Sequence, residues 1–428
     1  MKTIGIDLTP LQGPHRMRGV GSVIINFLNN VNEYEIEDIS FVAFLYESNA
    51  DEIIALTGLN KLRHEVRFVQ PQSHQLPSIK TFKGLTFIPL RLYRHLKLRL
   101  FGNTRLGDLS NIDEVLQFEQ NVTPPPIPTT VVAYDLIPYI LEKDYLWSYK
   151  TARNDHGYSR RGALLAHLRR HRYISEIRTV SRKAHKIIAI SEYTKHDFLR
   201  YANTNSAKIT VIPLGVTKKL KAKSNVPIHI EHYVATDWGD IKRSNEILLQ
   251  PFLLFVGGVD PRRKLSDLIA AYNILKAQDI DIKLVLAGDT LFGPNSIPNT
   301  EVREAILNSS YPEDILLLGF VDDTTRDRLY RQATAFVYPS HYEGFGLPIL
   351  EAMRYGTPVI TYNNSSIKEV AKDAALYAHD AASIANNVLK LMLNSNMKTE
   401  YEELSIKQAD KFSWKITASS ILNLLKRD

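Results

Sequence analysis

The sequence contains no cysteine among its 428 residues. Disulfide bonds, thiolate zinc sites and cysteine nucleophiles are therefore excluded. No apolar run reaches the roughly 18 residues that a membrane-spanning helix needs. The opening residues, MKTIGIDLTP, have the pattern of a buried strand that ends in a turn, not that of a signal peptide. We therefore expect a protein of the reducing cytoplasm.

Recognisable cofactor motifs are missing as well. The thirteen histidines show no HExxH or comparable metal-ligand spacing. No GxGxxG motif opens a strand–helix unit, which argues against a dinucleotide-dependent oxidoreductase. We expect no metal ion and no other cofactor.

Acidic residues are absent from two long stretches of the first half. None lies between Glu65 and Asp108, although eight Lys and Arg residues do. None lies in residues 156–175, whose cations are Arg160, Arg161, Arg169, Arg170 and Arg172. Residues 1–215 carry 28 Lys and Arg against 20 Asp and Glu, a net of +8, whereas residues 216–428 carry 25 against 26, a net of −1. This basic excess suits an anionic partner, either membrane lipid, a phosphate-bearing acceptor or nucleic acid.

Continuous apolar segments alternate with segments of helical period. In the second half the apolar segments are 252–259, 282–288, 315–320, 333–340 and 358–362, with helical patterns at 265–277 and 325–333. The first half repeats this less regularly at 3–8, 41–46, 66–70, 129–136, 186–191 and 208–214. Apolar strands separated by helices indicate a parallel sheet that is covered on both faces. We therefore predict an α/β protein of two doubly wound, Rossmann-like domains.

The composition also suggests domain boundaries. We assign residues 1–215 to the first domain and 251–405 to the second. The polar, lysine-rich residues 216–250 are predicted to be a linker with a surface excursion. Residues 406–428 are predicted to form a C-terminal helix that packs back towards the first domain.

The most informative segment runs from 338 to 360. An apolar strand is followed by a loop and then by Pro348, which we place at the first helical position; the loop residues are Glu343, Gly344, Phe345, Gly346 and Leu347. A glycine loop before a helix N-terminus forms an anion site that fits a pyrophosphate. Glu351, which we place in the first helical turn, can then bind a ribose, and Glu343 a transferred sugar. The alternative, equally weighted on this spacing alone, is that Glu351 complements the helix dipole and Glu343 is solvated.

The Glu343-x7-Glu351 spacing within PSHYEGFGLPILEAM resembles the signature of the retaining glycosyltransferases of family 4. Five further blocks match that family in the expected order, namely VVAYDLIP (131–138), IAISEYTKHDF (188–198), VIPLGV (211–216), GGVDPRRKLSDLIAAY (257–272) and LLGFVDD (317–323). The resemblance implies the GT-B fold, in which the two domains face a central cleft. It also implies that Glu343 contacts the donor sugar, as a catalytic residue, and that Glu351 contacts the nucleotide ribose.

A cationic cluster, Arg262, Arg263 and Lys264, follows a buried strand and opens a helix. Cations at this position can neutralise a diphosphate and stabilise the leaving nucleotide. The alternative is a solvated turn. The resemblance assigns donor binding to this cluster, but the sequence departs from the family here, with Arg263 in place of lysine and Lys264 in place of asparagine. Which side chain reaches the phosphate is therefore left open.

In the first domain, Gly19 and Gly21 precede a helical pattern, and a tight turn explains this pair as well as a binding role does. The resemblance implies that their backbone approaches the donor phosphate. Tyr134 and Asp135 end an apolar strand, and the resemblance makes them catalytic candidates. Many family members have histidine where this sequence has Tyr134, and Asp135 is as well explained by a cap on the following turn.

The nucleotide base is assigned by resemblance to Val321 and Asp323. An acidic side chain there can accept hydrogen bonds from guanine, which hints at a GDP donor, although turn acids are common. The resulting hypothesis is a metal-independent hexosyltransferase that moves mannose from GDP-mannose to a glycan or lipid-linked acceptor in surface polysaccharide synthesis. The alternatives are a UDP-sugar-dependent hexosyl- or N-acetylhexosaminyltransferase and an inactive nucleotide-sugar-binding protein.

A contact with an anionic membrane is a further expectation. Residues 90–101 (LRLYRHLKLRLF) fit either a membrane-surface segment with its arginines among the headgroups or an ordinary helix. The expected partners are thus a nucleotide sugar, an acceptor and an anionic membrane surface, without nucleic acid. The expected location is the cytoplasm, with peripheral attachment to the inner face of the membrane as an extension of that hypothesis.

Overall fold

The structure is a computed structural model that describes residues 1–13, 16, 19–34, 38–62, 64–69, 106–217, 227–235, 241–288 and 300–427. The chain divides into two compact units, Met1–Gly215 with Trp414–Asp428, and Val216–Ser413. Each is described by itself below. The segment 90–101, for which membrane contact was predicted, lies outside the described residues.

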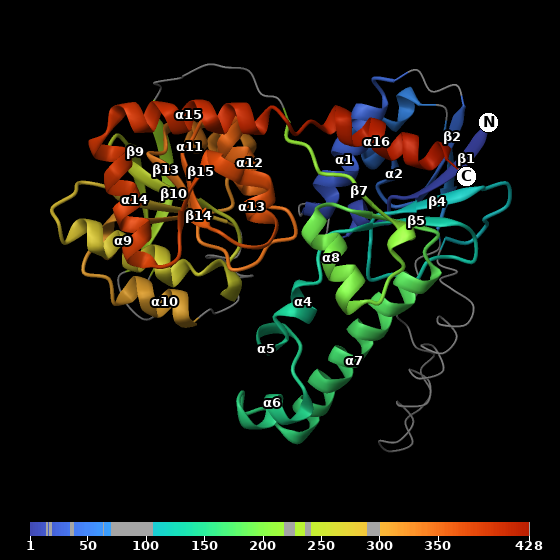
Figure 1. The fold of residues 1–428 in the computed structure, drawn as a ribbon, viewed down its shortest axis with the longest axis horizontal. Coiled ribbons are helices and arrows are strands. Elements are labelled where there is room, and N and C mark those ends of the chain that lie inside the picture. Colours follow the sequence, from blue (N-terminus) through green and yellow to red (C-terminus); the bar gives the residue numbers. More distant parts are fainter. Residues whose placement is uncertain are drawn as a thin grey trace. The chain divides into compact units, whose positions relative to one another are not determined.

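The first unit is built on a parallel sheet of seven strands in the order β3-β2-β1-β4-β5-β6-β7 (Figure 1). Its interior strands are buried along most of their length because the chain covers both faces with helices. The order reverses direction between β1 and β4, which is the doubly wound arrangement. The strands are β1 (Lys2–Asp7), β2 (Ile39–Leu45), β3 (His64–Phe68), β4 (Glu114–Gln117), β5 (Thr129–Ala133), β6 (Lys186–Ala189) and β7 (Ile209–Val211).

The helices of this unit include one from each end of the chain. In α1 the buried side chains recur at helical spacing, so that one face packs on the core. The C-terminal helix α16 packs against α1, and Lys2 Nζ at the start of β1 donates to the carbonyl of Leu425 in α16 at 2.7 Å. The helices are α1 (Gly19–Val31), α2 (Ala50–Thr57), α4 (Ile137–Ile140), α5 (Glu142–Tyr145), α6 (Tyr149–Asn154), α7 (Arg160–Lys183), α8 (Glu192–Tyr201) and α16 (Trp414–Lys426).

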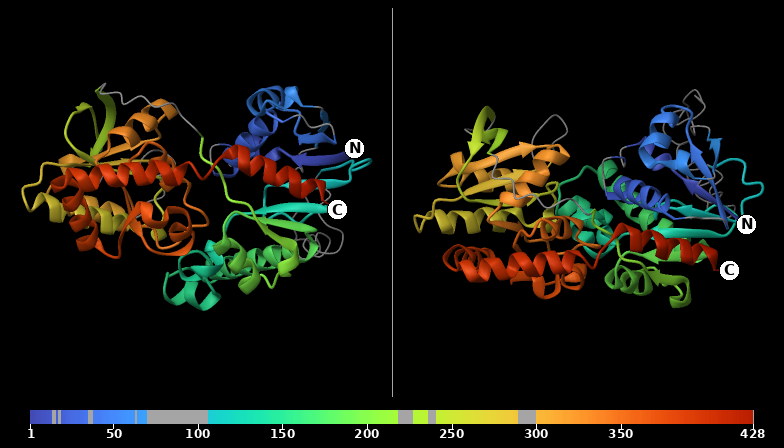
Figure 2. Two further views of the ribbon diagram at one scale, coloured as in Figure 1. Left: turned by 45° about the horizontal axis from the view of Figure 1, so that its top comes forward. Right: turned by 90° about the horizontal axis from the view of Figure 1, so that it is seen from above.

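The second unit repeats the doubly wound arrangement in the order β15-β14-β13-β10-β11-β12, with all neighbours parallel. An antiparallel pair, β8 and β9, extends the sheet beyond β12 to eight strands (Figure 2). The order reverses between β10 and β13. The strands are β8 (Ile228–Ala235), β9 (Ile241–Leu248), β10 (Phe252–Val256), β11 (Lys283–Ala287), β12 (Ile315–Gly319), β13 (Ala335–Tyr338), β14 (Val359–Tyr362) and β15 (Ala375–Ala378).

Helices cover both faces of this second sheet. The helix α14 packs against α9, and α15 packs against α12. The helices are α9 (Leu265–Lys276), α10 (Thr300–Leu307), α11 (Asp323–Gln332), α12 (Leu347–Arg354), α13 (Ser365–Ala371), α14 (Ala381–Leu393) and α15 (Ser395–Ala409). Short 3-10 turns occur at Thr9–Gln12, Leu59–Lys61, Ser206–Lys208, Pro261–Arg263, Pro312–Asp314 and Lys372–Ala374.

The structure differs from the sequence prediction in residues 216–250. Instead of forming only a linker and surface excursion, residues 228–248 supply β8 and β9 to the second sheet. The sequence of β9, IKRSNEIL, is polar because an edge strand pairs on one side only and leaves part of its surface to solvent. Its Glu246 forms an ion pair with Lys283 at the start of β11. A polar edge strand therefore looks like a loop when only apolar runs are counted.

Candidate active site

Two loops meet at the point where the strand order of the second sheet reverses. The strands β10 and β13 are adjacent, with Leu253 paired to Ala335. Residues 257–264 follow β10, and residues 339–346 follow β13. In open α/β sheets the C-terminal ends of strands at such a reversal form the ligand-binding crevice. The sheet topology thus brings the predicted cationic cluster to the predicted glutamate loop.

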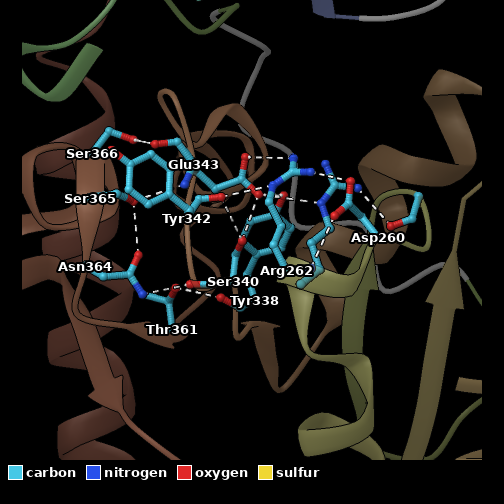
Figure 3. A network of polar contacts seen from close by, with 12 residues as sticks. Asp260, Arg262, Tyr338, Ser340, Tyr342, Glu343, Thr361, Asn364, Ser365 and Ser366 are labelled. Carbon is cyan, nitrogen blue, oxygen red and sulfur yellow. Dashed lines mark hydrogen bonds and ion pairs between the residues drawn. The ribbon is translucent and has the colours of Figure 1, made fainter. Parts of the chain in front are cut away.

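Glu343 lies at the centre of this meeting point (Figure 3). Its Oε1 accepts hydrogen bonds from Tyr338 Oη at 2.8 Å and Ser340 Oγ at 2.9 Å. Its Oε2 accepts a longer bond from Arg262 Nη2 at 3.4 Å. The residue is only 7% exposed. Glu343 is therefore not a solvated loop residue, which removes one of the two bland interpretations of the motif.

The charge on Glu343 is stabilised by its neighbours. Burial alone would raise the pKa of this carboxyl, but Arg262 and Arg263 outweigh burial and hold the pKa below its ordinary value. Arg263 Nε lies 3.5 Å from Oε1. The pKa of Arg263 is raised although burial acts to lower it, because Tyr338 and Glu343 favour the cation. The carboxylate is thus ionised at neutral pH inside the protein.

The backbone around Glu343 is held by the segment that follows β14. Its N–H donates to Ser365 Oγ at 3.0 Å, and its carbonyl accepts from Ser366 Oγ at 2.7 Å. Asn364 Nδ2 donates to the carbonyl of Ser340 at 2.9 Å. Ser365 has a left-handed backbone with φ of +42°, an uncommon conformation for a residue with a side chain. These contacts position the carboxylate through its main chain as well as its side chain.

The cationic cluster is tied into the protein to different degrees. Arg262 forms an ion pair with Asp260, and its Nε donates to the carbonyl of Tyr342 at 3.0 Å. Arg263 Nη1 donates to the carbonyl of Gly258 at 2.9 Å. Lys264 begins α9 with φ of +41°, and its amino group makes no hydrogen bond or ion pair with any residue that the structure describes. Lys264 is therefore the member whose charge is free for a ligand.

The glycine loop ends at Gly346, which caps α12 with φ of +103°, a conformation that strongly favours glycine. Phe345 is buried, and its ring meets that of Phe412 edge-on at 5.9 Å. Helix α12 begins at Leu347, so Pro348 is its second residue. The sequence prediction, which placed Pro348 first, was wrong by one residue. Glu351 consequently lies in the second turn, beyond the first-turn position expected for it.

Glu351 has an environment opposite to that of Glu343. Its Oε2 accepts a hydrogen bond from Tyr330 Oη at 3.1 Å. Burial raises the pKa of this carboxyl, and Arg326 and Tyr330 offset the increase only in part. Pairs of carboxyl groups whose pKa values are displaced in opposite directions are typical of functional sites.

The predicted base contacts lie at the start of α11. Asp322 caps this helix by accepting from the N–H of Thr325 at 2.8 Å. Asp323 follows in the first turn, is paired with Arg326 at 2.9 Å and has a side chain 75% exposed. Val321 is half-buried in the loop after β12. Arg326 interacts with both Asp323 and Glu351, so it links the predicted base and ribose contacts.

In the first unit, Gly19 is the first residue of α1 and Gly21 is buried in its first turn. A Cβ placed on Gly19 would meet no atom of the described residues within 4 Å, and its φ is not positive. Neither packing nor a left-handed turn therefore requires glycine at this position. The tight-turn explanation of the Gly19–Gly21 pair is weakened accordingly.

Tyr134 and Asp135 follow β5, beside the strand reversal of the first sheet. Gln120, in the loop after β4, accepts from the N–H of Tyr134 at 2.7 Å and donates to the carbonyl of Asp135. Asp135 Oδ1 accepts from the N–H of Ile137 at 3.0 Å, which is the predicted turn cap. The hydroxyl of Tyr134 is buried without a hydrogen-bond partner in the described part of the chain, and burial raises its pKa.

These structural features coincide with a family match. A model of the family described as "Glycosyl transferases group 1" matches residues 238–408, which include Arg262, Glu343 and Glu351. The second unit therefore carries a glycosyl transferases group 1 domain.

The chain has distant curated relatives. It is 28% identical to O-antigen chain mannosyltransferase B of Escherichia coli over 246 residues, which cover 56% of this chain and 60% of the relative. It is 28% identical to the serotype-specific mannosyltransferase WbdA of E. coli over 299 residues, which cover 68% of this chain and 32% of the relative. The chain therefore spans less than two thirds of the length of either relative.

Solved structures share its fold over the whole chain. HepE of Anabaena, solved with UDP and glucose, has a TM-score of 0.61 at 15% identity, with complete coverage of both chains. WaaG, a glycosyltransferase involved in lipopolysaccharide biosynthesis, has a TM-score of 0.60 at 16% identity and covers 99% of this chain and 100% of its own. The prediction of a GT-B protein with two Rossmann-like domains is confirmed.

Sequence reasoning missed several residues that hold the candidate site together. Tyr338 ends β13 and Ser340 lies two residues further on, so both side chains are expected on the same side of the chain. This spacing of two hydroxyl groups was a signal available in the sequence. Tyr330, Arg326 and Gln120 carried no such signal, because their partners lie in other elements.

Neither a metal-ligand cluster nor a membrane-spanning helix occurs in the described ranges. No group of three or more His, Asp or Glu side chains there is arranged to hold a metal ion. Among the same residues, every helix is too short or too polar to cross a membrane.

Proposed function

We propose that this chain is a retaining, metal-independent glycosyltransferase. It transfers a hexose from a nucleotide-diphosphate sugar to a glycan or lipid-linked acceptor in surface polysaccharide synthesis. The observation that carries the proposal is the environment of Glu343, an ionised and buried carboxylate at the strand reversal of the second sheet. A buried charge is costly unless partners compensate for its burial, and a carboxylate held in this way at a strand reversal is typical of a functional site.

The geometry of Glu343 leaves room for a sugar hydroxyl. Oε1 already accepts from Tyr338 and Ser340. Oε2 has only the long contact with Arg262 among the described residues, at 3.4 Å. A carboxylate oxygen has two acceptor positions, so Oε2 is the atom that receives a hydroxyl of the transferred hexose. Tyr338, Ser340 and the two arginines keep the Glu343 carboxylate ionised and hold its orientation while it binds the sugar hydroxyl.

The diphosphate is proposed to lie against the loop of Gly344, Phe345, Gly346 and Leu347, at the first turn of α12. Free N–H groups there bind anions, and Gly346 lets the backbone approach closely. Lys264 supplies a cation that no described protein group engages. Arg262 and Arg263 contribute positive potential from fixed positions, since their donors are engaged by protein groups. Glu351 binds the ribose through the oxygen that Tyr330 leaves free.

The proposed reaction breaks the bond between the anomeric carbon and the diphosphate oxygen. A new bond forms from the same face between that carbon and the acceptor oxygen, and the leaving diphosphate takes the acceptor's proton. The N–H groups of α12 and the nearby cations stabilise the charge that develops on the diphosphate. No step requires a metal ion or another cofactor.

The first unit is proposed to bind the acceptor, and its residues 1–215 form the acceptor-side domain, with residues 251–405 as the donor-side domain. Gly19 and Gly21 approach the donor phosphate through their backbone. Tyr134 offers its unpartnered hydroxyl to a sugar oxygen. Asp135 stays in the proposal as a residue that orients this strand end, because its carboxylate already caps the turn at Ile137.

The proposed donor is GDP-mannose, and the proposed transferred sugar is mannose. Relatives named as mannosyltransferases support the sugar, and Asp323, with Val321 beside it, supplies an exposed acidic group for a guanine base. A UDP-sugar donor is the second candidate, favoured by the UDP complex of HepE. An inactive nucleotide-sugar-binding protein is the third, favoured by tyrosine at position 134, which is a weaker proton donor than a histidine.

The proposal places the protein in the cytoplasm, at the inner face of the membrane. The net charge of +8 on residues 1–215 supports an anionic membrane surface as a partner of the first unit. Nucleic acid is not proposed as a partner, because it would leave the Glu343 network without a role.

Thermal unfolding in the presence of GDP, UDP, ADP or dTDP tests the proposal first. A nucleotide at about 100 times its Kd should stabilise the native state by about 2.7 kcal/mol. GDP selectivity supports the GDP-mannose donor, and UDP selectivity replaces it by the second candidate. Release of nucleotide from the matching sugar conjugate then separates an enzyme from an inactive binder. If no nucleotide raises the unfolding temperature, the donor site is wrong.

A further inference from the structure

The helices α6 and α7 of the first unit carry an unusual concentration of exposed apolar side chains. Leu164, Leu165 and Leu168 are 46%, 47% and 50% exposed. Their spacing places them on one face of α7. Tyr149 and Tyr158 are 41% and 40% exposed nearby. Residues 149–168 thus hold five of the 14 large apolar side chains exposed in the described part of the chain. Scattered exposed leucines need no explanation, but a cluster on one helix does.

The same segment is strongly cationic. Arg160 and Arg161 open α7 and Arg169 lies two turns on, all three exposed. Within the described ranges none of these three makes an ion pair, whereas Arg170 pairs with Glu142 and Arg172 with Glu176. Cations in the first turn of a helix oppose its dipole and destabilise it. Helix stability therefore does not account for Arg160 and Arg161.

An aromatic corner supports the leucine face. Trp147 stacks on His156 with ring centroids 4.1 Å apart, and its indole N–H donates to the carbonyl of Lys143. Trp147, Tyr158, Leu165 and Arg169 line a pocket of about 150 Å³. The C-terminal half of α7 is anchored by Ile177 and Val180 in the core of the first unit, while its N-terminal half runs out to α6 (Figure 1). We call residues 147–172 the α6–α7 tip.

We propose that the α6–α7 tip docks on an anionic lipid membrane. The three leucines enter the boundary between headgroups and acyl chains, and the unpaired arginines bind lipid phosphates. Trp147, Tyr149 and Tyr158 have the amphipathic rings that favour this depth. This surface is separate from residues 90–101, for which membrane contact was one of two interpretations of the sequence and which lie outside the described residues.

The occupant follows from the combination of charge and apolarity. A nucleic acid would pair with the arginines but leave the leucines in water. A second copy of the tip would bring two cationic faces together, which opposes self-association. An anionic bilayer offers phosphates and an apolar layer within a few ångströms of each other.

The test is cosedimentation of the full chain with vesicles of phosphatidylcholine, with and without phosphatidylglycerol. Binding to the anionic vesicles alone is expected, and it should weaken with added salt. The variant R160Q/R161Q/R169Q should bind about fivefold more weakly for each arginine removed. The variant L164S/L165S/L168S should lose binding while its thermal unfolding changes only slightly, since about half of the surface of each side chain is already exposed.

Two matched controls are available. L393S alters a leucine that is 81% exposed at the end of α14 in the second unit. R178Q removes an exposed arginine of α7 outside the tip. Both should bind anionic vesicles like the wild-type protein. Since the assay contains neither donor nor acceptor, its outcome is independent of the proposed transfer reaction.

Three results would overturn the proposal. They are no binding to the anionic vesicles, equal binding to neutral ones, and binding that both tip variants retain. Sedimentation velocity adds a fourth. If the wild-type protein is a dimer that L164S/L165S/L168S converts to a monomer and no vesicle binding occurs, the leucine face is a subunit interface instead.

Discussion

The hydroxyl of Tyr330 donates to Oε2 of Glu351 over 3.1 Å and so links α11 to α12. Tyr330 is fully buried, and its ring stacks on that of Tyr355 with centroids 5.7 Å apart. The position of Glu351 is therefore determined by the packing of a neighbouring helix. The position of Glu343, eight residues earlier, is determined instead by Tyr338 at the end of β13 and by Arg262.

Replacing Tyr330 by Phe should weaken nucleotide binding while the ring packing stays. The change removes one hydrogen bond to a buried carboxyl group, which costs about 1–3 kcal/mol, and Glu351 loses a partner that lowers its pKa. We expect the Kd for the preferred nucleotide diphosphate to rise about tenfold, with a larger increase at acidic pH. Calorimetric titration over a pH series measures both. An unchanged Kd at every pH would separate Tyr330 from the ribose contact.

Replacing Glu343 by Gln should destabilise the protein and abolish transfer. The amide keeps the shape but leaves Arg262 and Arg263 without their buried counter-charge, at a cost of about 3 kcal/mol. Urea unfolding measures the loss. The control Glu403→Gln alters an exposed member of an ion pair on α15 and should change the free energy of unfolding by less than about 0.5 kcal/mol.

The acid dependence of stability should change in the same variant. The pKa of Glu343 is lower in the native state than its ordinary value of 4.5, so the native state binds fewer protons than the unfolded state. The stabilisation from Glu343 is therefore complete above pH 4.5 and is lost as the pH falls through the lower native pKa. Unfolding free energies across the acidic range should fall less steeply in Glu343→Gln than in the wild-type protein. Parallel curves for the two proteins would contradict the lowered pKa.

Replacing Lys264 by Asn should weaken diphosphate binding without loss of stability. Asparagine tolerates the left-handed backbone that Lys264 has, and the amino group it removes has no partner in the described residues. We expect about a tenfold rise in Kd for the nucleoside diphosphate and a smaller one for the monophosphate, since the monophosphate carries less negative charge for the lysine to neutralise. Lys407→Asn, on the exposed surface of α15, is the matched control. If both variants bind alike, the phosphate lies elsewhere.

Replacing Gly346 by Ala should destabilise the second unit by about 1–2 kcal/mol, because a side chain at φ of +103° is strained even though the nearest atom, Ile349 Cδ1, is 3.6 Å away. Thermal unfolding detects the change. Gly19→Ala is the comparison, since Gly19 has no positive φ and open space around it. It should leave stability unchanged and lower donor binding. A stability loss in Gly19→Ala would return this residue to a structural role.

Much of the second unit was predictable because most of its strands are continuous apolar runs in the sequence. The apolar runs 252–259 and 315–320 correspond to β10 and β12, since strands buried on both faces have no polar alternation to obscure them. The strands β4 and β15 escaped prediction because EVLQ begins and ends with polar residues and ALYA is half alanine, which is depleted in strands. The strand β9 was not predicted because an edge strand can be polar and then shows no apolar run in the sequence.

The candidate site also has features that the sequence predicted and features that it did not. The residue types of the Glu343 loop and of Arg262 to Lys264 predicted an anion site with carboxylates, and the structure brings both groups to one strand reversal. The assignment of phosphate neutralisation to all three cations did not anticipate that Arg262 and Arg263 would be engaged by Glu343 and by backbone carbonyls. Helix register was also off by one residue, which moved Glu351 from the first turn of α12 to the second.

The amino-acid sequence by itself determined the α/β class, the doubly wound pattern and the family of this protein, because periodicity and short motifs depend on neighbours within a few residues. Only the tertiary structure decided which charges meet. Arg262 lies 81 positions before Glu343 in the chain, and β10 pairs with β13 because the order of the parallel sheet reverses there. The opposite displacements of the Glu343 and Glu351 pKa values likewise depend on burial and on partners from other elements, which no local pattern encodes.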